Sequence, residues 1–319
     1  MSLPLPRPSP RQTPEPPLHS VALHDGPLVS IADWACRGED TRAGAEELAG
    51  GHQLIVGRSG VFVTRRGREQ LVVGPAQVLF LNAGEPYRVS HPVPGGDRCT
   101  VLRFSRDALG EALARLEPAR RGGADVRFRI GHAPLRPPEV LRLHRLRQRL
   151  RRLEASPLEA EEEALELLHA ALGDPYREGG RGMPRESPSP GTLGRRRRLV
   201  EAARLRLASC PGDDLSLTRL AREAGCSPFH LARVFRQENG LPVHRYLTRL
   251  RLALALSRLE QGESNLSALA LDLGFSSHGH FTAVFRSAFG VPPSSLRCEP
   301  RRRDPLSTPH CPPPTSIVT

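Results

Sequence analysis

The fold of this chain is decided in its last third, by 217-LTRLAREAGCSPFHLARVFRQENGLPVHRYLTRLRL-252. Its apolar residues recur at helical spacing up to Gly225, and a second helical pattern follows Ser227-Pro228. Serine is a preferred helix N-cap, and proline is accepted in a first turn because no N–H is needed there. Glycine tolerates the positive φ of a tight turn. The stretch therefore predicts two short helices joined by a tight turn, a helix-turn-helix unit.

The same unit recurs in 266-LSALALDLGFSSHGHFTAVFRSAFGVPPSSLR-297. The offset is 49 residues through the first helix and 50 after it, where Val234-Phe235-Arg236 matches Val284-Phe285-Arg286. This is an internal duplication of one supersecondary unit. Apolar residues between the copies, from Val243 to Leu254, predict one long helix that holds the two units.

The second helix of the first copy has two faces. Leu231, Val234 and Phe235 form its apolar face, and an exposed stripe lies opposite. A helix-turn-helix inserts such a stripe, near the helix N-terminus, into the major groove. The predicted DNA-contacting residues of the first copy are Phe229, Ala232, Arg233 and Arg236.

The matching stripe of the second copy carries fewer hydrogen-bond donors. It consists of Gly279, Thr282, Ala283 and Arg286, so base readout falls to His278 and Thr282 or, alternatively, to His280. Arg286 and the helix N-terminus can hold phosphate. We expect the first copy to specify sequence and the second to clamp the backbone.

The charge of the chain is unevenly distributed. Residues 194–298 contain 16 arginines against 8 acidic residues, whereas residues 21–172 contain 22 against 20. A basic segment favours a polyanionic partner, although a genome that favours Arg over Lys would also enrich it. Two such units with net charge +8 indicate double-stranded DNA as the partner.

Composition also excludes several classes of protein. No apolar run reaches 18 residues, and the Pro-rich N-terminus has no apolar segment, so we expect a cytoplasmic protein without a membrane span or secretory signal. The six cysteines form no C-x-x-C pair, which argues against a disulfide framework or zinc finger. The sequence shows no arrangement typical of an enzyme and no cofactor motif.

The N-terminal half predicts short strands followed by two helices. Strands are expected at 54–56, 61–64, 71–73, 78–81, 99–104 and 126–130, which suggests a small barrel. Leucine stripes predict a helical hairpin from Glu139 to Leu172, with a capping box at Ser156 and Glu159. We expect the hairpin to mediate homodimerisation through Leu146 and Leu150, the alternative being that its stripes cover the sheet.

These patterns predict an α+β two-domain protein. Its expected divisions are a disordered tail at 1–20, a β-barrel domain at 21–172, a linker at 173–194, an all-α double helix-turn-helix domain at 195–298 and a disordered tail at 299–319.

Both quoted stretches resemble the arabinose-regulator (AraC/XylS-type) family. The resemblance implies a seven-helix DNA-binding domain, a cupin-like barrel that senses a small effector and dimerises, and regulation of transcription with RNA polymerase as a partner. It places base readout at Phe229, Ala232 and Arg233, and at His278, Gly279 and Ala283. Ala283 departs from the family, which commonly has Arg or Lys there, and Leu296 replaces a usual aromatic residue.

The segment 78-VLFLNAGEPYRVSHP-92 resembles the sensor domains of that family. It suggests an effector pocket inside the barrel, lined by Phe62, Phe80, Asn82, Tyr87 and His91. A sharper hypothesis adds Cys36, His91 and Cys99 as a soft metal or thiol-reactive site, against the alternative that the cysteines are small buried hydrophobes.

Two other functions remain open from the sequence. The barrel could be a metal-dependent cupin enzyme fused to a DNA reader, but His52 and His91 are isolated and form no H-x-H pair. No metal ligand set is therefore predicted. A nucleoid-type binder without sequence preference is the third possibility.

Overall fold

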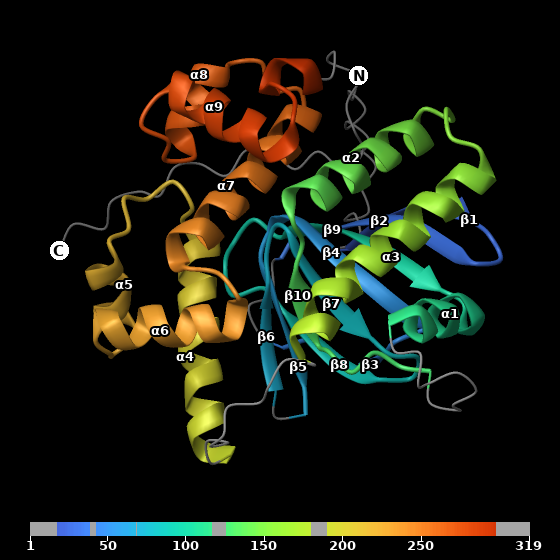
Figure 1. Cartoon of the computed structure of the whole chain (residues 1–319), viewed down its shortest axis with the longest axis horizontal. Coiled ribbons are helices and arrows are strands. Elements are labelled where there is room, and N and C mark those ends of the chain that lie inside the picture. Colours follow the sequence, from blue (N-terminus) through green and yellow to red (C-terminus); the bar gives the residue numbers. More distant parts are fainter. Residues whose placement is uncertain (1–17, 39–42, 68, 117–125, 180–189, 298–319) are drawn as a thin grey trace, which may run out of the picture.

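The computed structural model describes residues 18–38, 43–67, 69–116, 126–179 and 190–297 (Figure 1). The N-terminal half is rich in strands, and the C-terminal half is helical. Among the described residues, no helix is both long enough and apolar enough to cross a membrane.

Two sheets build the barrel. The first has the order β1 (Leu18–Asp25), β2 (Val29–Cys36), β9 (Asp97–Phe104), β4 (His52–Gly60), β7 (Gln77–Leu81), β10 (His132–Pro134). The second has the order β3 (Glu47–Leu48), β8 (Pro86–Ser90), β5 (Phe62–Arg66), β6 (Glu69–Val73). Apolar side chains from both sheets form one core, among them Ile55, Phe62, Leu79, Leu81 and Val101.

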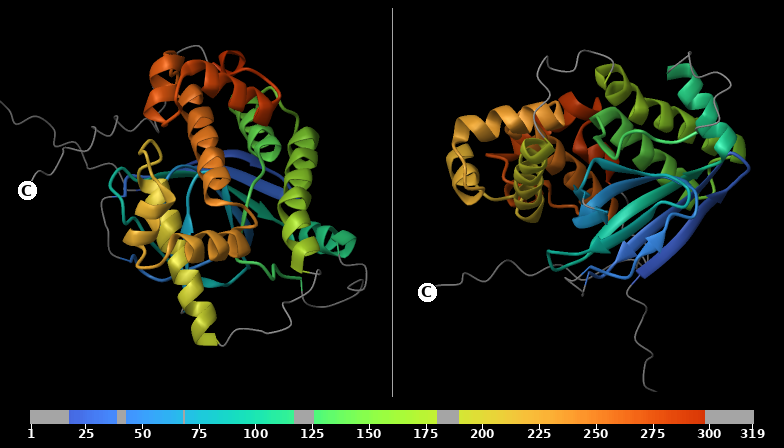
Figure 2. Two further views of the ribbon diagram at one scale, coloured as in Figure 1. Left: turned by 60° about the vertical axis from the view of Figure 1, so that its left-hand side comes forward. Right: turned by 90° about the horizontal axis from the view of Figure 1, so that it is seen from below.

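Helices cover the opposite face of the six-stranded sheet. These are α1 (Arg106–Leu116), α2 (Pro137–Arg151) and α3 (Pro157–Gly179), which lie on one side of the strands (Figure 2). The predicted capping box at the start of α3 is present: the Glu159 carboxylate accepts from the Ser156 backbone N–H at 2.8 Å. Leu146 and Leu150 are buried in the core beneath the hairpin, so the leucine stripes cover the sheet.

The helical half contains both predicted helix-turn-helix units. The first is α5 (Leu217–Glu223) with α6 (Pro228–Asn239), and the second is α8 (Leu266–Asp272) with α9 (His278–Phe289). The long α7 (Val243–Glu260) joins them, α4 (Pro190–Ser209) precedes them, and the short 3-10 helix η2 (Pro293–Leu296) follows. The predicted fold class, a cupin-like β-barrel with a helical hairpin followed by an all-α double helix-turn-helix, is confirmed.

Several predicted elements differ from the structure. Residues 126–130 alternate but form no strand, because the Asn82 side chain bonds both backbone groups of Phe128, at 2.7 and 3.1 Å. The strand at the outer edge of β7 is β10, which lies just after the predicted strand. The sequence patterns also missed α1 and the strands β1, β2, β3 and β8. Within the expected linker, α3 continues to Gly179 and α4 begins at Pro190, and the linker residues between these helices lie outside the described ones. Nearly all residues of both predicted tails also lie outside the described ones.

The two halves pack against each other. Leu141 of α2 is buried in the same apolar cluster as Leu256 of α7 and Phe285 of α9. Helix α2 therefore contacts the sheet through one side and the second helix-turn-helix unit through another.

Candidate nucleic-acid interface

The first recognition helix, α6, is defined at both ends by local interactions. The Ser227 hydroxyl accepts from the His230 backbone N–H at 3.2 Å, and Pro228 occupies the first turn. Gly240 ends the helix with φ of 68°, in the left-handed region. Leu231, Val234 and Phe235 are fully buried, as their spacing predicts.

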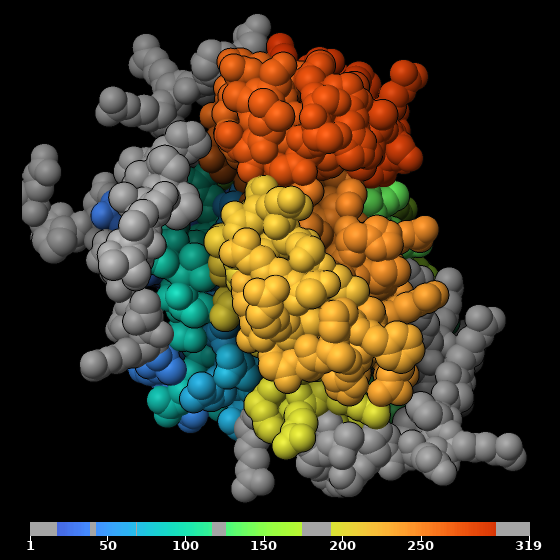
Figure 3. Space-filling view, turned by 90° about the vertical axis from the view of Figure 1, so that its left-hand side faces the viewer, coloured from blue at the N-terminus to red at the C-terminus, as the bar shows by residue number. Residues whose placement is uncertain are grey.

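The opposite stripe of α6 faces solvent. Arg233 and Arg236 are exposed, Ala232 is half-buried, and Phe229 exposes 81% of its surface. A large apolar ring with so little cover, beside two exposed guanidinium groups, forms a surface suited to thymine methyls, guanine edges and phosphates. Figure 3 shows the two helix-turn-helix units stacked on one face of the molecule.

The second recognition helix, α9, has the same construction with different chemistry. Ser277 caps it by accepting from the His280 backbone N–H at 3.1 Å. Its stripe is exposed at His278, Gly279, Ala283 and Arg286, and half-buried at Thr282. The His280 ring already contacts the Ser276 hydroxyl, at 2.9 Å, and packs edge-on to Phe275. The contact of His278 Nε2 with the Thr282 hydroxyl is longer, at 3.4 Å, so His278 is better placed than His280 to reach a base.

Arg251 connects the turn of the second helix-turn-helix unit to the loop between α4 and α5. From α7 it donates to the Gly274 carbonyl at 2.8 Å and to the Pro211 carbonyl at 2.7 Å. Gly274 is the turn residue of the second unit, with φ of +75°, and a Cβ there would lie 2.5 Å from the Arg251 guanidinium. The turn therefore requires glycine for its conformation and for the close approach of Arg251.

The residues predicted to line one effector pocket do not share one cavity. Phe62 lies in the core between the sheets, whereas Phe80 is in the core beneath α2 and α3. Placing Phe80 in the barrel interior was wrong, because alternation along β7 turns Leu79 and Leu81 inward instead. The Tyr87 hydroxyl donates to Glu47 at 2.8 Å near the surface.

Two grooves lie beside the loop that precedes β10. One, of about 670 Å³, includes Arg66, Asn82 and Arg129 in its lining. The other, of about 420 Å³, shares Arg129 with the first and reaches Arg197 and Glu238 of the helical half. The loop thus lies between a groove on the barrel and one that contacts the DNA-binding half.

A buried ion cluster connects the two halves. Arg147 of α2 is 1% exposed and donates to Asp33 of β2, at 2.6 and 2.7 Å, and to Glu260 at the end of α7, at 2.9 Å. Arg58 and Arg151 lie within 4.0 Å of both carboxylates. The barrel half therefore holds the last residue of α7, the helix that connects the two recognition units.

The neighbouring arginines decide the ionisation of the two carboxylates in this cluster. Burial alone would raise the pKa of Asp33, but Arg147 and Arg58 outweigh burial and hold that pKa well below its ordinary value. The pKa of Glu260 is likewise held low by Arg147, against the effect of burial. Both carboxylates are therefore ionised at neutral pH.

A second polar contact ties α4 to the free edge of β6. The Glu201 carboxylate accepts from the Val72 N–H at 2.6 Å, and fully buried Arg204 donates to the Val72 carbonyl at 2.7 Å. Arg204 also donates to Gln77 at 2.8 Å. Two side chains of the helical half thus satisfy the backbone of an edge strand, as a neighbouring strand would.

The histidines weighed as metal ligands lie far apart. β4 pairs with β9 so that His52 faces Phe104 and Gly60 faces Asp97, the partner of His91. Eight residues of strand separate these ends by about 26 Å at 3.3 Å per residue. His52 and His91 therefore cannot share an ion, and a cupin-type metal set built on them is not assembled.

Sequence reasoning missed the residues that join the halves. Asp33, Arg147 and Glu260 are more than a hundred positions apart, and no motif links them. It also paired Cys36 and His91 with Cys99, where the structure pairs them with Asp97. The short loop from His91 to Asp97 was the available signal.

Comparison with known proteins supports this arrangement. A sequence model of a helix-turn-helix domain matches residues 220–299, and one of an AraC-binding-like domain matches residues 24–173. An uncharacterized HTH-type transcriptional regulator of Haemophilus influenzae is 32% identical over 98 residues, which cover 31% of this chain and 33% of that protein. The HTH-type transcriptional activator RhaS of Pectobacterium carotovorum is 43% identical over 67 residues, covering 21% and 24%.

The chain thus spans about a third and about a quarter of the length of these two relatives. Among solved structures, apo ToxT of Vibrio cholerae covers 85% of this chain and 97% of its own, at 12% identity and a TM-score of 0.36. Along the sequence, the AraC-binding-like domain comes first and the helix-turn-helix domain second. The chain belongs to the AraC-type family of transcriptional regulators.

Proposed function

We propose that this chain is a sequence-specific, effector-responsive transcription regulator whose two helix-turn-helix units enter successive major grooves of DNA. The observation that carries the proposal is the pair of capped helices, α6 and α9, each with an exposed stripe and each held by α7. Two recognition helices on one face must be about 34 Å apart to enter successive turns of the duplex.

We further propose that the two helices contribute unequally. Arg233 can donate two hydrogen bonds to guanine O6 and N7, while Phe229 and Ala232 can pack on thymine methyl groups. The second stripe has no donor at Gly279 or Ala283. His278 and Thr282 are short and at best monodentate, so α9 mainly positions the protein on phosphate through Arg286 and its N-terminus.

The proposed effector site is the groove of about 670 Å³ on the barrel. Of the five residues first considered for a pocket, it retains Asn82, and its arginines and glutamates favour a polar ligand. A ligand there would contact the loop around Arg129 that also borders α4 through the second groove. Moving this loop, or the ion cluster at Glu260, would alter how the DNA-binding half is held.

The remaining partners follow from the family. The proposal includes action in the cytoplasm, contact with RNA polymerase at promoters, and a homodimer. Because Leu146 and Leu150 are buried within the chain, a dimer would use other residues. Leu153 and Leu158, at the tip of the helical hairpin, expose 93% and 66% of their surfaces and are available for this contact.

Genome-wide mapping of bound sites, combined with footprinting of the purified full chain, tests the proposal. A regulator gives footprints with defined edges upstream of a few genes whose expression changes when the protein is removed. Footprints without edges, spread along any DNA, would show a nucleoid-type binder instead. The genes beside the bound sites would also indicate the class of effector.

A further inference from the structure

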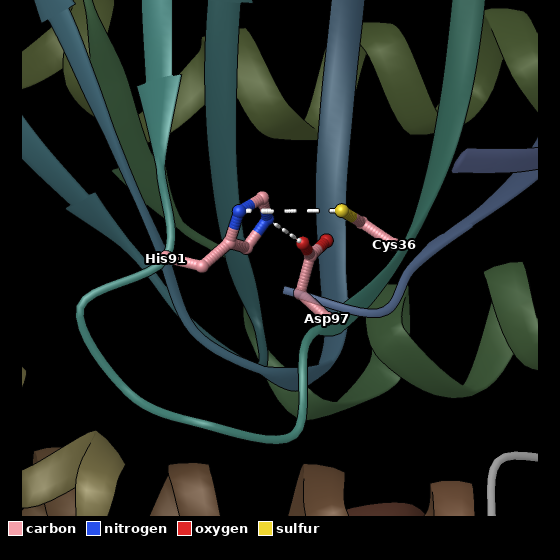
Figure 4. Close-up of side chains that lie close together, drawn as sticks. All are labelled: Cys36, His91 and Asp97. Atoms are coloured by element: carbon pink, nitrogen blue, oxygen red, sulfur yellow. Dashed lines mark hydrogen bonds and ion pairs between the residues drawn. The ribbon is translucent and has the colours of Figure 1, made fainter. Parts of the chain in front are cut away.

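Three chemically complementary side chains meet at the rim of the barrel, away from the DNA interface. Cys36 is the last residue of β2 and pairs across the sheet with Asp97, the first residue of β9. His91 follows β8 and points between them (Figure 4). Residues opposite each other in an antiparallel pair have Cβ atoms about 5 Å apart. Strand register therefore sets the separation of the Cys36 and Asp97 side chains.

Tight backbone packing holds this part of the rim in place. Gly38, Gly60 and Gly96 all have positive φ, which other residues rarely adopt. A Cβ on Gly96 would lie 1.8 Å from the Cys36 carbonyl oxygen, and a Cβ on Gly60 would lie 2.0 Å from the Gly96 carbonyl oxygen. The chain segments that carry the three side chains thus approach too closely to shift independently.

The three side chains form a relay of hydrogen bonds. The Asp97 carboxylate lies 2.7 Å from His91 Nε2, and His91 Nδ1 lies 4.0 Å from Cys36 Sγ. The pKa of His91 is raised to about 10, first by its hydrogen bond to Asp97 and then by that to Cys36. At neutral pH the imidazole is therefore a cation beside the sulfur, where it stabilises negative charge.

We propose that Cys36 is a nucleophilic thiol that is covalently modified by small soft carbon electrophiles, with the His91 imidazolium stabilising its thiolate and Asp97 as the positioning residue. The arrangement has three parts: the attacking sulfur, the cation beside it that favours its deprotonated form, and the carboxylate that orients the cation. The thiol proton leaves to solvent. The sulfur then attacks carbon, a C–S bond forms, and the bond from that carbon to its leaving group breaks.

No other cysteine in the described part of the chain has this environment. Cys99 is enclosed in the barrel, and burial raises its pKa, so it is an unreactive thiol. It faces Trp34 in the register, which makes it a diagonal neighbour of Cys36 at about 7–8 Å. That separation exceeds the usual disulfide range, so Cys99 cannot resolve the reaction without backbone movement.

Rates of alkylation by iodoacetamide test the proposal directly. The folded full chain, kept in chelator, is quenched at intervals, and each cysteine peptide is quantified by mass spectrometry. Cys226 is the internal control, because it is half-buried and its pKa is raised by burial. Cys36 should react at least about tenfold faster than Cys226, with iodide as the leaving group.

Two variants separate the roles of the partners. His91→Asn should bring the Cys36 rate to within about threefold of that of Cys226, and Asp97→Asn should give an intermediate rate. The comparison within the wild type needs no variant to fold. Cys36 reacting no faster than Cys226 would overturn the proposal.

A metal site is the rival explanation, since one donor atom from each residue lies within 4.8 Å of the others. If Cys36 reacts rapidly only after chelator treatment and one zinc ion per chain is released, the cluster is a metal site and the proposal is wrong. Neither result depends on whether the chain binds DNA.

Discussion

Removing one charge from the ion cluster between the two halves should loosen their docking. We choose Glu260→Gln, because glutamine keeps the shape of glutamate and leaves a carbonyl oxygen that can still accept from Arg147. Glu260 is 8% exposed and lies within 4.0 Å of three arginines. In the variant, those arginines retain Asp33 as their only carboxylate within this cluster.

The magnitude follows from burial and partner number. Removing one partner of a buried ion pair costs roughly 3–5 kcal/mol, because it leaves a charge uncompensated. The retained amide still forms one hydrogen bond to a charged donor, so we expect a loss of about 2–3 kcal/mol. An exposed pair provides the control: Glu111→Gln, beside Arg115, should change stability by no more than about 0.5 kcal/mol.

Urea unfolding followed by two probes measures the effect. Trp34 is the only tryptophan and neighbours Asp33, so its fluorescence reports on the barrel, while far-UV circular dichroism is dominated by the helices. The two transitions should coincide in the wild type, because the halves are docked. In Glu260→Gln the midpoint should fall by about 1 M, with the helical signal changing first. A midpoint equal to that of Glu111→Gln would refute the reasoning.

Further predictions concern pH, the hairpin and α4. The pKa values of Asp33 and Glu260 lie below their ordinary values of 3.8 and 4.5, so the two carboxylates stabilise the fold fully at neutral pH, and this stabilisation is lost as pH falls through the lowered values. When the urea midpoint is titrated with acid, it should therefore fall less in Glu260→Gln than in the wild type. The pKa of His91 is raised to about 10, so its contribution to the free energy of unfolding is complete below pH 6.5 and is lost as pH rises through 10. Asp97→Asn should remove this loss from the alkaline limb of the same titration. Leu150→Arg should unfold the chain by circular dichroism, whereas Leu153→Arg should leave it folded and, if the hairpin tip forms the dimer, sediment as a monomer. Arg204→Gln should accelerate hydrogen exchange at the Val72 amide, because α4 loses the Arg204 bonds to Val72 and Gln77 and because Glu201, which accepts from that amide, loses the guanidinium that holds it.

The DNA-binding half could be predicted because its signals are local. Each helix boundary is set within a few residues, by a serine cap such as Ser227 and a glycine such as Gly240. The apolar positions of α6 repeat with the helical period and are buried accordingly. Duplication then let each copy support the interpretation of the other.

The effector pocket could not be predicted, because strand register decides which face a residue occupies. All five residues of β7 are buried, so the run has no polar alternation to tell Phe80 from Leu81. β2 was missed because a charged residue stands at one of its buried positions. Asp33 interrupts its apolar alternation, and the carboxylate is tolerated only because Arg147 and Thr100 satisfy it. Those partners come from distant parts of the sequence.

A selected-site experiment with the full chain tests the central claim most directly. Randomised duplexes are enriched by binding to the wild type, Arg233→Ala and Arg286→Ala, and the information at each base is compared. The account predicts an informative half-site and, one helical turn away, a poor one. Arg233→Ala should cost about 1–3 kcal/mol and relax one base, while Arg286→Ala should weaken all sites alike and lower the salt dependence by about one counterion. Two equally informative half-sites, or loss of base preference in Arg286→Ala, would contradict it.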